Sequence, residues 1–187
     1  MPYGNPIVGD FPQKLKPAIP RYVLPGWYFN GKQNGSALAN GDIIYIPIFV
    51  SETTLFTRVG AEITTAGAGG STLEIRLFAW NEGVPGALIE DFGSISLAAG
   101  ATVEIVIALT LPRGYYFLAM RTATGVGAIL EVPLVTNAVM PPLPGLDNSP
   151  AGVARPLLTV ASAWANPAPA PTNFTSALFA GLYLREN

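Results

Sequence analysis

Residues 71–92 read STLEIRLFAWNEGVPGALIEDF, and this stretch decides the fold class. In its first half Leu73, Ile75 and Leu77 alternate with polar or charged residues, which is the period-2 pattern of a strand with one buried face. The following NEGVPG, residues 81–86, contains two glycines and a proline, the residues that supply unusual or fixed φ angles in turns. The stretch therefore predicts two strands joined at a corner of a sheet.

The same alternation recurs along the chain, and no segment shows helical periodicity. Turn-rich breaks such as AGAGGS, AAGA and LPRG separate the runs at close to the 8–12-residue spacing expected of an all-β domain. The sequence predicts an antiparallel β-sandwich, most simply a jelly roll, with an immunoglobulin-like sandwich as the alternative. The predicted strands are 43–50, 55–65, 71–80, 87–90, 102–109, 114–122 and 127–135, and residues 94–97 either continue the 87–90 strand or form a separate short strand.

Proline divides the chain into a predicted arm and a predicted domain. Residues 1–31 carry six prolines, which disfavour helix and internal strand pairing, so an extended N-terminal arm is expected there. The sandwich domain is expected over residues 32–187. It includes a Pro-rich loop excursion at 136–174 and a strand at 175–185 that returns to the sheet.

Charged residues make up only 12% of the 187 residues, with 12 acids and 10 bases. Soluble domains usually contain about 25% charged residues. Two interpretations are open: other copies or partners cover much of the surface, or Ser, Thr, Asn and Gly supply uncharged polar groups. The first is favoured, and it predicts a homo-oligomer. The sparse bases predict no nucleic-acid partner, and no apolar run approaches the length of a membrane span.

The chain contains no cysteine and no histidine, which removes thiolate chemistry, the commonest metal ligand and any Ser-His-Asp triad. The adjacent acids Glu90 and Asp91 would point to opposite faces of a strand. With Asp42 and Asp147 they could offer oxygen ligands to calcium, but they lack the dense acidic spacing of a dedicated loop. We expect no catalytic residues, no metal and no cofactor.

Aromatic residues supply the candidate binding positions. Trp80 and Asn81 stand where a strand meets the turn, and an aromatic ring at a sandwich rim can stack on a sugar. The alternative is that Trp80 caps the core. Candidate assembly contacts with neighbouring subunits are Tyr3, Phe11, Tyr22, Trp27, Tyr28 and Trp164.

The order of features over residues 45–122 resembles a module of tailed-bacteriophage virion proteins. The matching stretches are YIPIFV (45–50), TRVGAEITTAGAGGSTLEIRLFAW (57–80), NEGVPGALIEDFG (81–93) and LPRGYYFLAMRT (111–122). The module is similar to carbohydrate-binding modules that phages reuse in decoration, tail and fibre proteins. Less than half of the chain is covered, and neither the arm nor the 136–174 excursion is included.

The resemblance implies a non-enzymatic structural protein of a virion, assembled in the host cytoplasm. It implies contacts with other virion proteins and a homo-oligomer, with a trimer favoured. A carbohydrate-binding or host-receptor-binding module, with a host surface glycan as ligand, is the alternative function.

Overall fold

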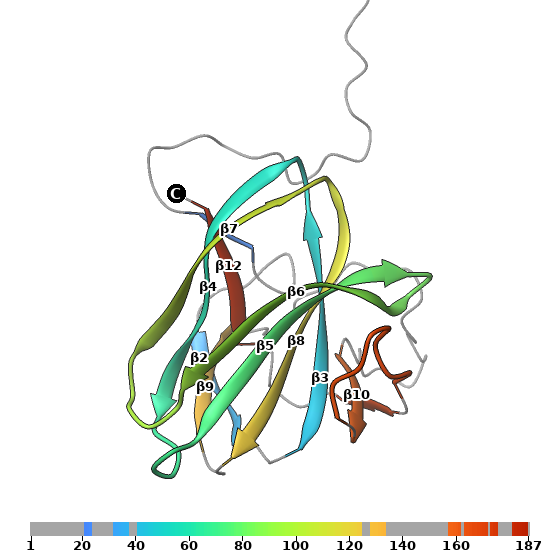
Figure 1. Ribbon diagram of the computed structural model, residues 1–187. Coiled ribbons are helices and arrows are strands. Elements are labelled where there is room, and N and C mark those ends of the chain that lie inside the picture. The colour runs from blue at the N-terminus through green and yellow to red at the C-terminus, as the bar shows by residue number, and fades with distance from the viewer. Residues whose placement is uncertain are drawn as a thin grey trace, which may run out of the picture.

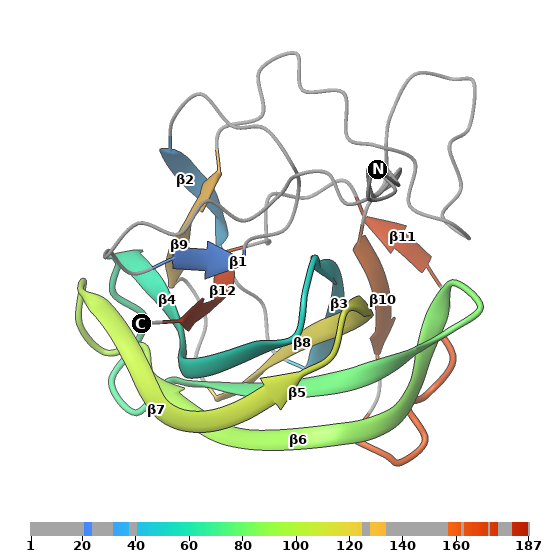
Figure 2. The same ribbon diagram turned by 90° about the horizontal axis from the view of Figure 1, so that it is seen from above.

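The computed structural model describes residues 21–23, 32–37, 41–124, 128–133, 157–161, 163–171, 173–175 and 181–186. All regular elements in these segments are strands, arranged in two antiparallel sheets (Figures 1 and 2). The predicted all-β, antiparallel two-sheet class is therefore confirmed, whereas the jelly-roll connectivity stays a prediction. Since no helix occurs in the described segments, none is long and apolar enough to cross a membrane.

The first sheet is organised around β4 (Thr54–Thr65), which pairs with three other strands. Two further strands extend it, with β1 beyond β12 and β2 beyond β9. The other members are β1 (Arg21–Val23), β2 (Lys32–Ala37), β7 (Thr102–Leu111), β9 (Ile129–Pro133) and β12 (Leu182–Glu186).

The second sheet has the order β11-β10-β3-β8-β5-β6, and every neighbouring pair is antiparallel. Its strands β3, β8 and β5 form the long central part seen in Figure 1. The members are β3 (Asp42–Val50), β5 (Thr72–Asn81), β6 (Val84–Ser96), β8 (Gly114–Thr124), β10 (Leu157–Ala161) and β11 (Asn173–Thr175).

Several boundaries differ from the sequence prediction. Strand β10 lies inside the 136–174 stretch that was expected to be an irregular excursion, β11 begins inside that stretch and ends at Thr175, and β1 lies inside the predicted arm. Residues 32–37, predicted as loop, form β2. Of the two alternatives for residues 94–97, continuation of the 87–90 strand is confirmed, since both segments belong to β6, where bulges absorb the irregular spacing without breaking the pairing.

The main core lies between the two sheets. In β3, Ile44, Ile46 and Ile48 point into it, and Leu118 and Met120 do the same in β8. These residues alternate along each strand with residues that point to the opposite face. Residues of β4 close the core from the first sheet, namely Phe56, Val59, Ala61 and Ile63.

The β5–β6 connection is a two-residue turn. Glu82 and Gly83 both have positive φ, 50° and 92°, as a type I′ hairpin turn requires. Pro85 lies in β6 opposite Trp80, so its predicted place in the turn was wrong. Gly86 also belongs to β6, and the predicted corner is confirmed only for Glu82 and Gly83.

Replacing Gly83 with Val should lower the free energy of unfolding by about 1–2 kcal/mol, because a β-branched residue fits poorly at positive φ. Chemical denaturation measures the change. The matched control is Glu82→Asn, which should keep the wild-type stability because Asn tolerates this conformation. A Gly83→Val protein as stable as the wild type would contradict the turn assignment.

Candidate functional site

The second sheet carries buried apolar side chains on both of its faces. Opposite the main core, Ile43, Tyr45, Phe78, Phe117 and Ala119 form a second cluster, and all five are fully buried. They come from β3, β8 and β5, which are adjacent in the sheet. A sheet that is apolar on both faces needs a cover on each side.

Aromatic rings dominate this outer surface, which we call the aromatic face. Trp80 lies almost parallel to Phe117, with ring centroids 4.9 Å apart and an interplanar angle of 2°. Tyr45 meets Phe78 edge-on at 5.7 Å. The stack of Trp80 on Phe117 supports the interpretation that Trp80 caps a buried cluster. The aromatic face comprises Tyr45, Phe49, Phe78, Trp80, Tyr115 and Phe117.

Residues 163–171, which we call the covering segment, lie on part of the aromatic face. The ring of Trp164 stacks on Phe78 with centroids 6.1 Å apart. The Arg76 guanidinium lies 4.6 Å from the centroid of the same Trp164 ring, a cation–π contact. The indole Nε1–H of Trp164 donates a 2.6 Å hydrogen bond to Glu74 Oε2. Trp164 therefore anchors the covering segment through stacking, cation–π and charge-assisted contacts.

Main-chain groups of β6 complete the attachment. The amide of Ala168 donates to the Gly86 carbonyl at 2.9 Å, and the Asn166 side-chain oxygen accepts from the Leu88 amide at 3.1 Å. Since β5 lies on the other side of β6, these bonds occupy part of the edge of the second sheet. The Tyr45 hydroxyl lies 3.5 Å from the Pro169 carbonyl oxygen, and burial raises the pKa of Tyr45 to about 12.

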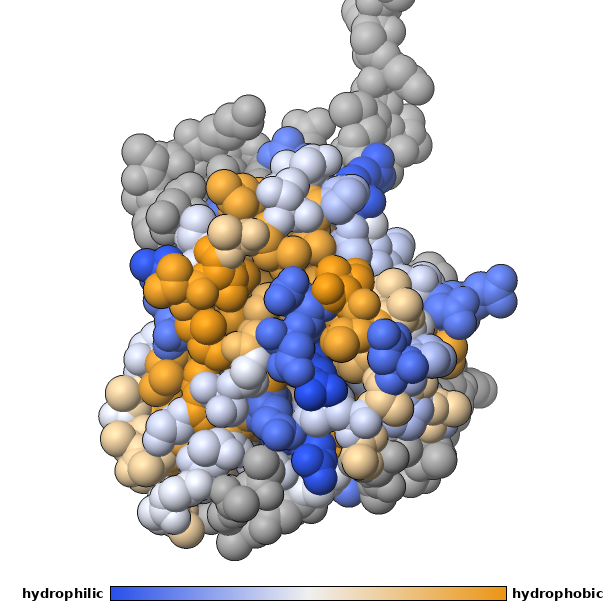
Figure 3. All heavy atoms as spheres, viewed as in Figure 1, coloured by the Kyte–Doolittle hydropathy of each residue, from blue (hydrophilic) through white to orange (hydrophobic). Residues whose placement is uncertain are grey.

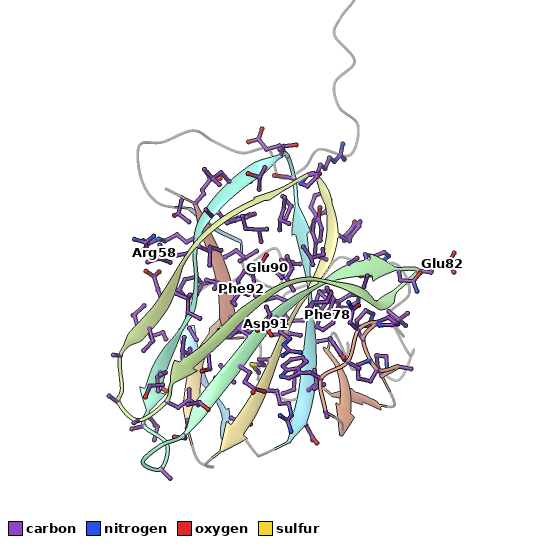
Figure 4. The ribbon with its side chains drawn as sticks, in the orientation of Figure 1. Arg58, Phe78, Glu82, Glu90, Asp91 and Phe92 are labelled. Atoms are coloured by element: carbon purple, nitrogen blue, oxygen red, sulfur yellow. The ribbon has the colours of Figure 1, made fainter. Side chains whose placement is uncertain are left out.

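Carboxylates around the aromatic face pair with arginines. Asp91 accepts from Arg76 at 2.7 Å, and Glu74 accepts from Arg121 at 3.3 Å. Glu90 and Asp91 lie on opposite sides of β6 (Figure 4), so the two acids do not converge on one point. Arg76 and Arg121 therefore balance the charges of Asp91 and Glu74 on this surface.

A similar cluster lies on the outer surface of the first sheet. Glu104 on β7 accepts from Arg185 and from the Tyr183 hydroxyl, each at 3.0 Å. The Nε atom of Arg58 lies 3.9 Å from the other carboxylate oxygen of Glu104. Gly60 of β4 stands directly between Tyr183 and Glu104 in the sheet. A Cβ at Gly60 would collide with the Val103 carbonyl oxygen, so glycine allows β7 its close approach to β4.

The predicted calcium candidates do not form a cluster. Asp42 begins β3, while Glu90 and Asp91 lie on β6 at the far edge of the sheet, and Asp147 lies outside the described residues. Within the part of the chain that the structure describes, no three Asp, Glu, His or Cys side chains gather closely enough to hold a metal ion.

The structure brings two of the predicted site residues together. Trp80 and Trp164 both pack against the second cluster, and Trp164 makes its contacts within its own chain. Asn81 is exposed and pairs with Val84 beside the hairpin turn. Tyr22 contributes its backbone to β1, opposite Arg185. The side chain of Tyr22 lies outside the described part of the chain, as do the other predicted assembly contacts, namely Tyr3, Phe11, Trp27 and Tyr28.

Sequence reasoning missed the buried rings Tyr45 and Phe117 as parts of a site. The available signal was the unbroken apolar run IIYIPIFV at 43–50, since such runs are typical of strands buried on both faces.

Comparison of the chain with protein-family models, with curated proteins and with solved structures finds no match.

Replacing Trp164 with Ala should detach the covering segment and lower the free energy of unfolding by about 2 kcal/mol, through lost stacking, cation–π and hydrogen-bond contacts. Hydrogen exchange should show faster exchange of the Leu88 and Ala168 amides. Trp164→Phe is the matched control, because it keeps a ring on Phe78 and should retain most of the protection. Unchanged exchange at both amides in Trp164→Ala would contradict the anchoring role.

Proposed function

We propose that the protein is a non-enzymatic structural subunit of a bacteriophage virion, a capsid decoration or a tail or fibre component, that assembles with further copies of itself. The observation that carries the proposal is exposed apolar surface on a protein with few charges. Val106 is 72% exposed and Leu55 is 55% exposed, and Val84 and Ile89 are also exposed. Monomeric proteins seldom leave large apolar patches uncovered.

Figure 3 shows that apolar residues gather on the face where β4, β6 and β7 lie, divided by a stripe of polar residues. Covering such a surface with other subunits would remove it from water at about 25 cal/mol per Å² of apolar area. The pairing of Glu74, Asp91 and Glu104 with arginines supports a structural role, since these acids already act as partners of cations. The resemblance of residues 45–122 to phage modules supports the virion as the place of assembly.

Sedimentation of the full chain in dilute buffer should give a mass of at least twice 19.6 kDa, the mass of one chain. The oligomer should persist at high salt, because apolar interfaces are screened little by ions. In electron microscopy, an antibody against the protein should label intact phage particles. A monomer at all accessible concentrations, with no label on particles, would overturn the proposal.

Sugar binding is the second candidate function, and one feature of the aromatic face favours it. The rings of Phe49, Tyr115 and Trp80 form a row with centroid spacings of 4.8 Å and 5.3 Å. All three side chains are only partly buried, so the row reaches the surface. Successive rings of this kind can stack on sugar units, and the exposed Asn81 beside Trp80 could supply a hydrogen bond.

A glycan array separates this candidate from a purely structural role. Tyr115→Ser should abolish sugar binding while leaving most of the stability, because Tyr115 is partly exposed. Trp80→Ala is a poorer probe, since Trp80 also supports the buried Phe117. The control is Leu55→Ser, an exposed position on the other sheet that should leave sugar binding unchanged. Absence of binding by the wild type to every glycan would remove the candidate.

A further inference from the structure

Strand β7 forms an open edge of the first sheet. Among the described residues it pairs with β4 alone, so its other edge has no strand beside it there. Its sequence, TVEIVIALTL, contains no proline or glycine and one charged residue, Glu104. A long apolar edge without such protective residues is a template for pairing with another chain.

Strand β6, the corresponding edge of the second sheet, is protected in several ways. Three register shifts interrupt its pairing with β5, and Gly93 has a positive φ of 81°. Pro85 lies within the strand, and the covering segment bonds the main chain at Gly86 and Leu88. Bulges, proline and covering segments are the usual protections of sheet edges. Within the described residues β6 is thus protected at more points than β7, whose pairing with β4 has one register shift, between Phe56 and Arg58.

The two faces of β7 show what a partner must fit. On the inner face, Val103, Ile105, Ile107 and Leu109 pack against the main core. On the outer face, Val106 is the most exposed of the large hydrophobic side chains in the described part of the chain. A partner strand would therefore need apolar residues at both faces near Val106.

We infer that β7 pairs with β7 of a second copy of this chain, antiparallel and centred on Val106. Because an antiparallel pair of identical strands has two-fold symmetry, each residue then meets one at the mirrored distance from the centre. All the resulting pairs are compatible, and they are Val106 with Val106, Ile105 with Ile107, Glu104 with Ala108, Val103 with Leu109 and Thr102 with Thr110.

Charge agrees with this register. The only charged residue of β7, Glu104, would face Ala108 of the other copy, so no like charges oppose each other. Its carboxylate is already paired with the Arg185 guanidinium and accepts a hydrogen bond from the Tyr183 hydroxyl of its own chain. An opposed Thr pair, as at Thr102 and Thr110, stabilises a sheet by a few tenths of a kcal/mol up to about 1 kcal/mol.

This inference rests on the proposed self-assembly and specifies its contact. A two-fold contact alone gives a dimer, whereas the trimer favoured from the resemblance would need a different, three-fold surface. Both contacts together would give a hexamer. The open edge of β7 therefore predicts an even number of subunits.

The test uses the absence of cysteine from the chain. In full-length Val106→Cys, the two introduced thiols would lie across the symmetry axis. Directly opposed residues of antiparallel strands have Cα atoms about 4.5–5.5 Å apart, within the range of a disulfide. Mild oxidation should convert most of the protein to a covalent dimer on a non-reducing gel. The control is Leu55→Cys, also exposed and apolar, which should remain mostly unlinked.

A second variant, Val106→Lys, should weaken association at least tenfold in sedimentation, with an unfolding midpoint for the monomer near that of the wild type. An oligomeric wild type in which Val106→Cys links no better than Leu55→Cys would overturn the β7 contact and leave the proposed function standing. A wild type that stays monomeric at all accessible concentrations would overturn the β7 contact, and together with no label on particles it would overturn the proposed function as well. If Val106→Lys destabilises the monomer itself, another part of the same chain covers β7, and the contact is likewise overturned.

Discussion

The structure depends on one constraint, that the central strands of the second sheet are apolar on both faces. Ile44 and Ile46 point to the main core, while Ile43 and Tyr45 point the other way. Burying a side chain of this size contributes about 1.5–3 kcal/mol, so neither face can be left in water without a large loss. The first sheet covers one face, and the covering segment, anchored by Trp164, covers part of the other.

This constraint also explains the difference between the two edges. After Trp164 stacks on Phe78, the covering segment continues to β6, where Asn166 and Ala168 bond to the main chain of Leu88 and Gly86. The edge of the second sheet is thereby protected by the same residues that bury its outer face. No described segment does the same for β7. Within the described residues one edge is closed and the other is open, as the proposed self-association through β7 requires.

The strands could be predicted where apolar residues alternate with polar ones or run together between turn signals, and they were missed where pairing is decided at long range. Residues 43–50, 55–65 and 114–122 were placed within two residues of their ends. In contrast, the polar sequence KQNGSA of β2 has no strand pattern, and its pairing with β9 comes from the tertiary fold. Trp80 and Trp164 could be named as candidates from their residue type. Their shared cluster could not, because sequence gives no strand order.

The order of segments along the chain has a consequence for synthesis. Tyr45 lies 124 residues before Pro169, its contact in the covering segment. A chain emerging from the ribosome at about 5–20 residues per second therefore exposes the aromatic rings of the second sheet for several seconds before their cover exists. During that interval the nascent protein is vulnerable to aggregation, and a chaperone that shields aromatic surfaces would improve the yield of correctly folded chains.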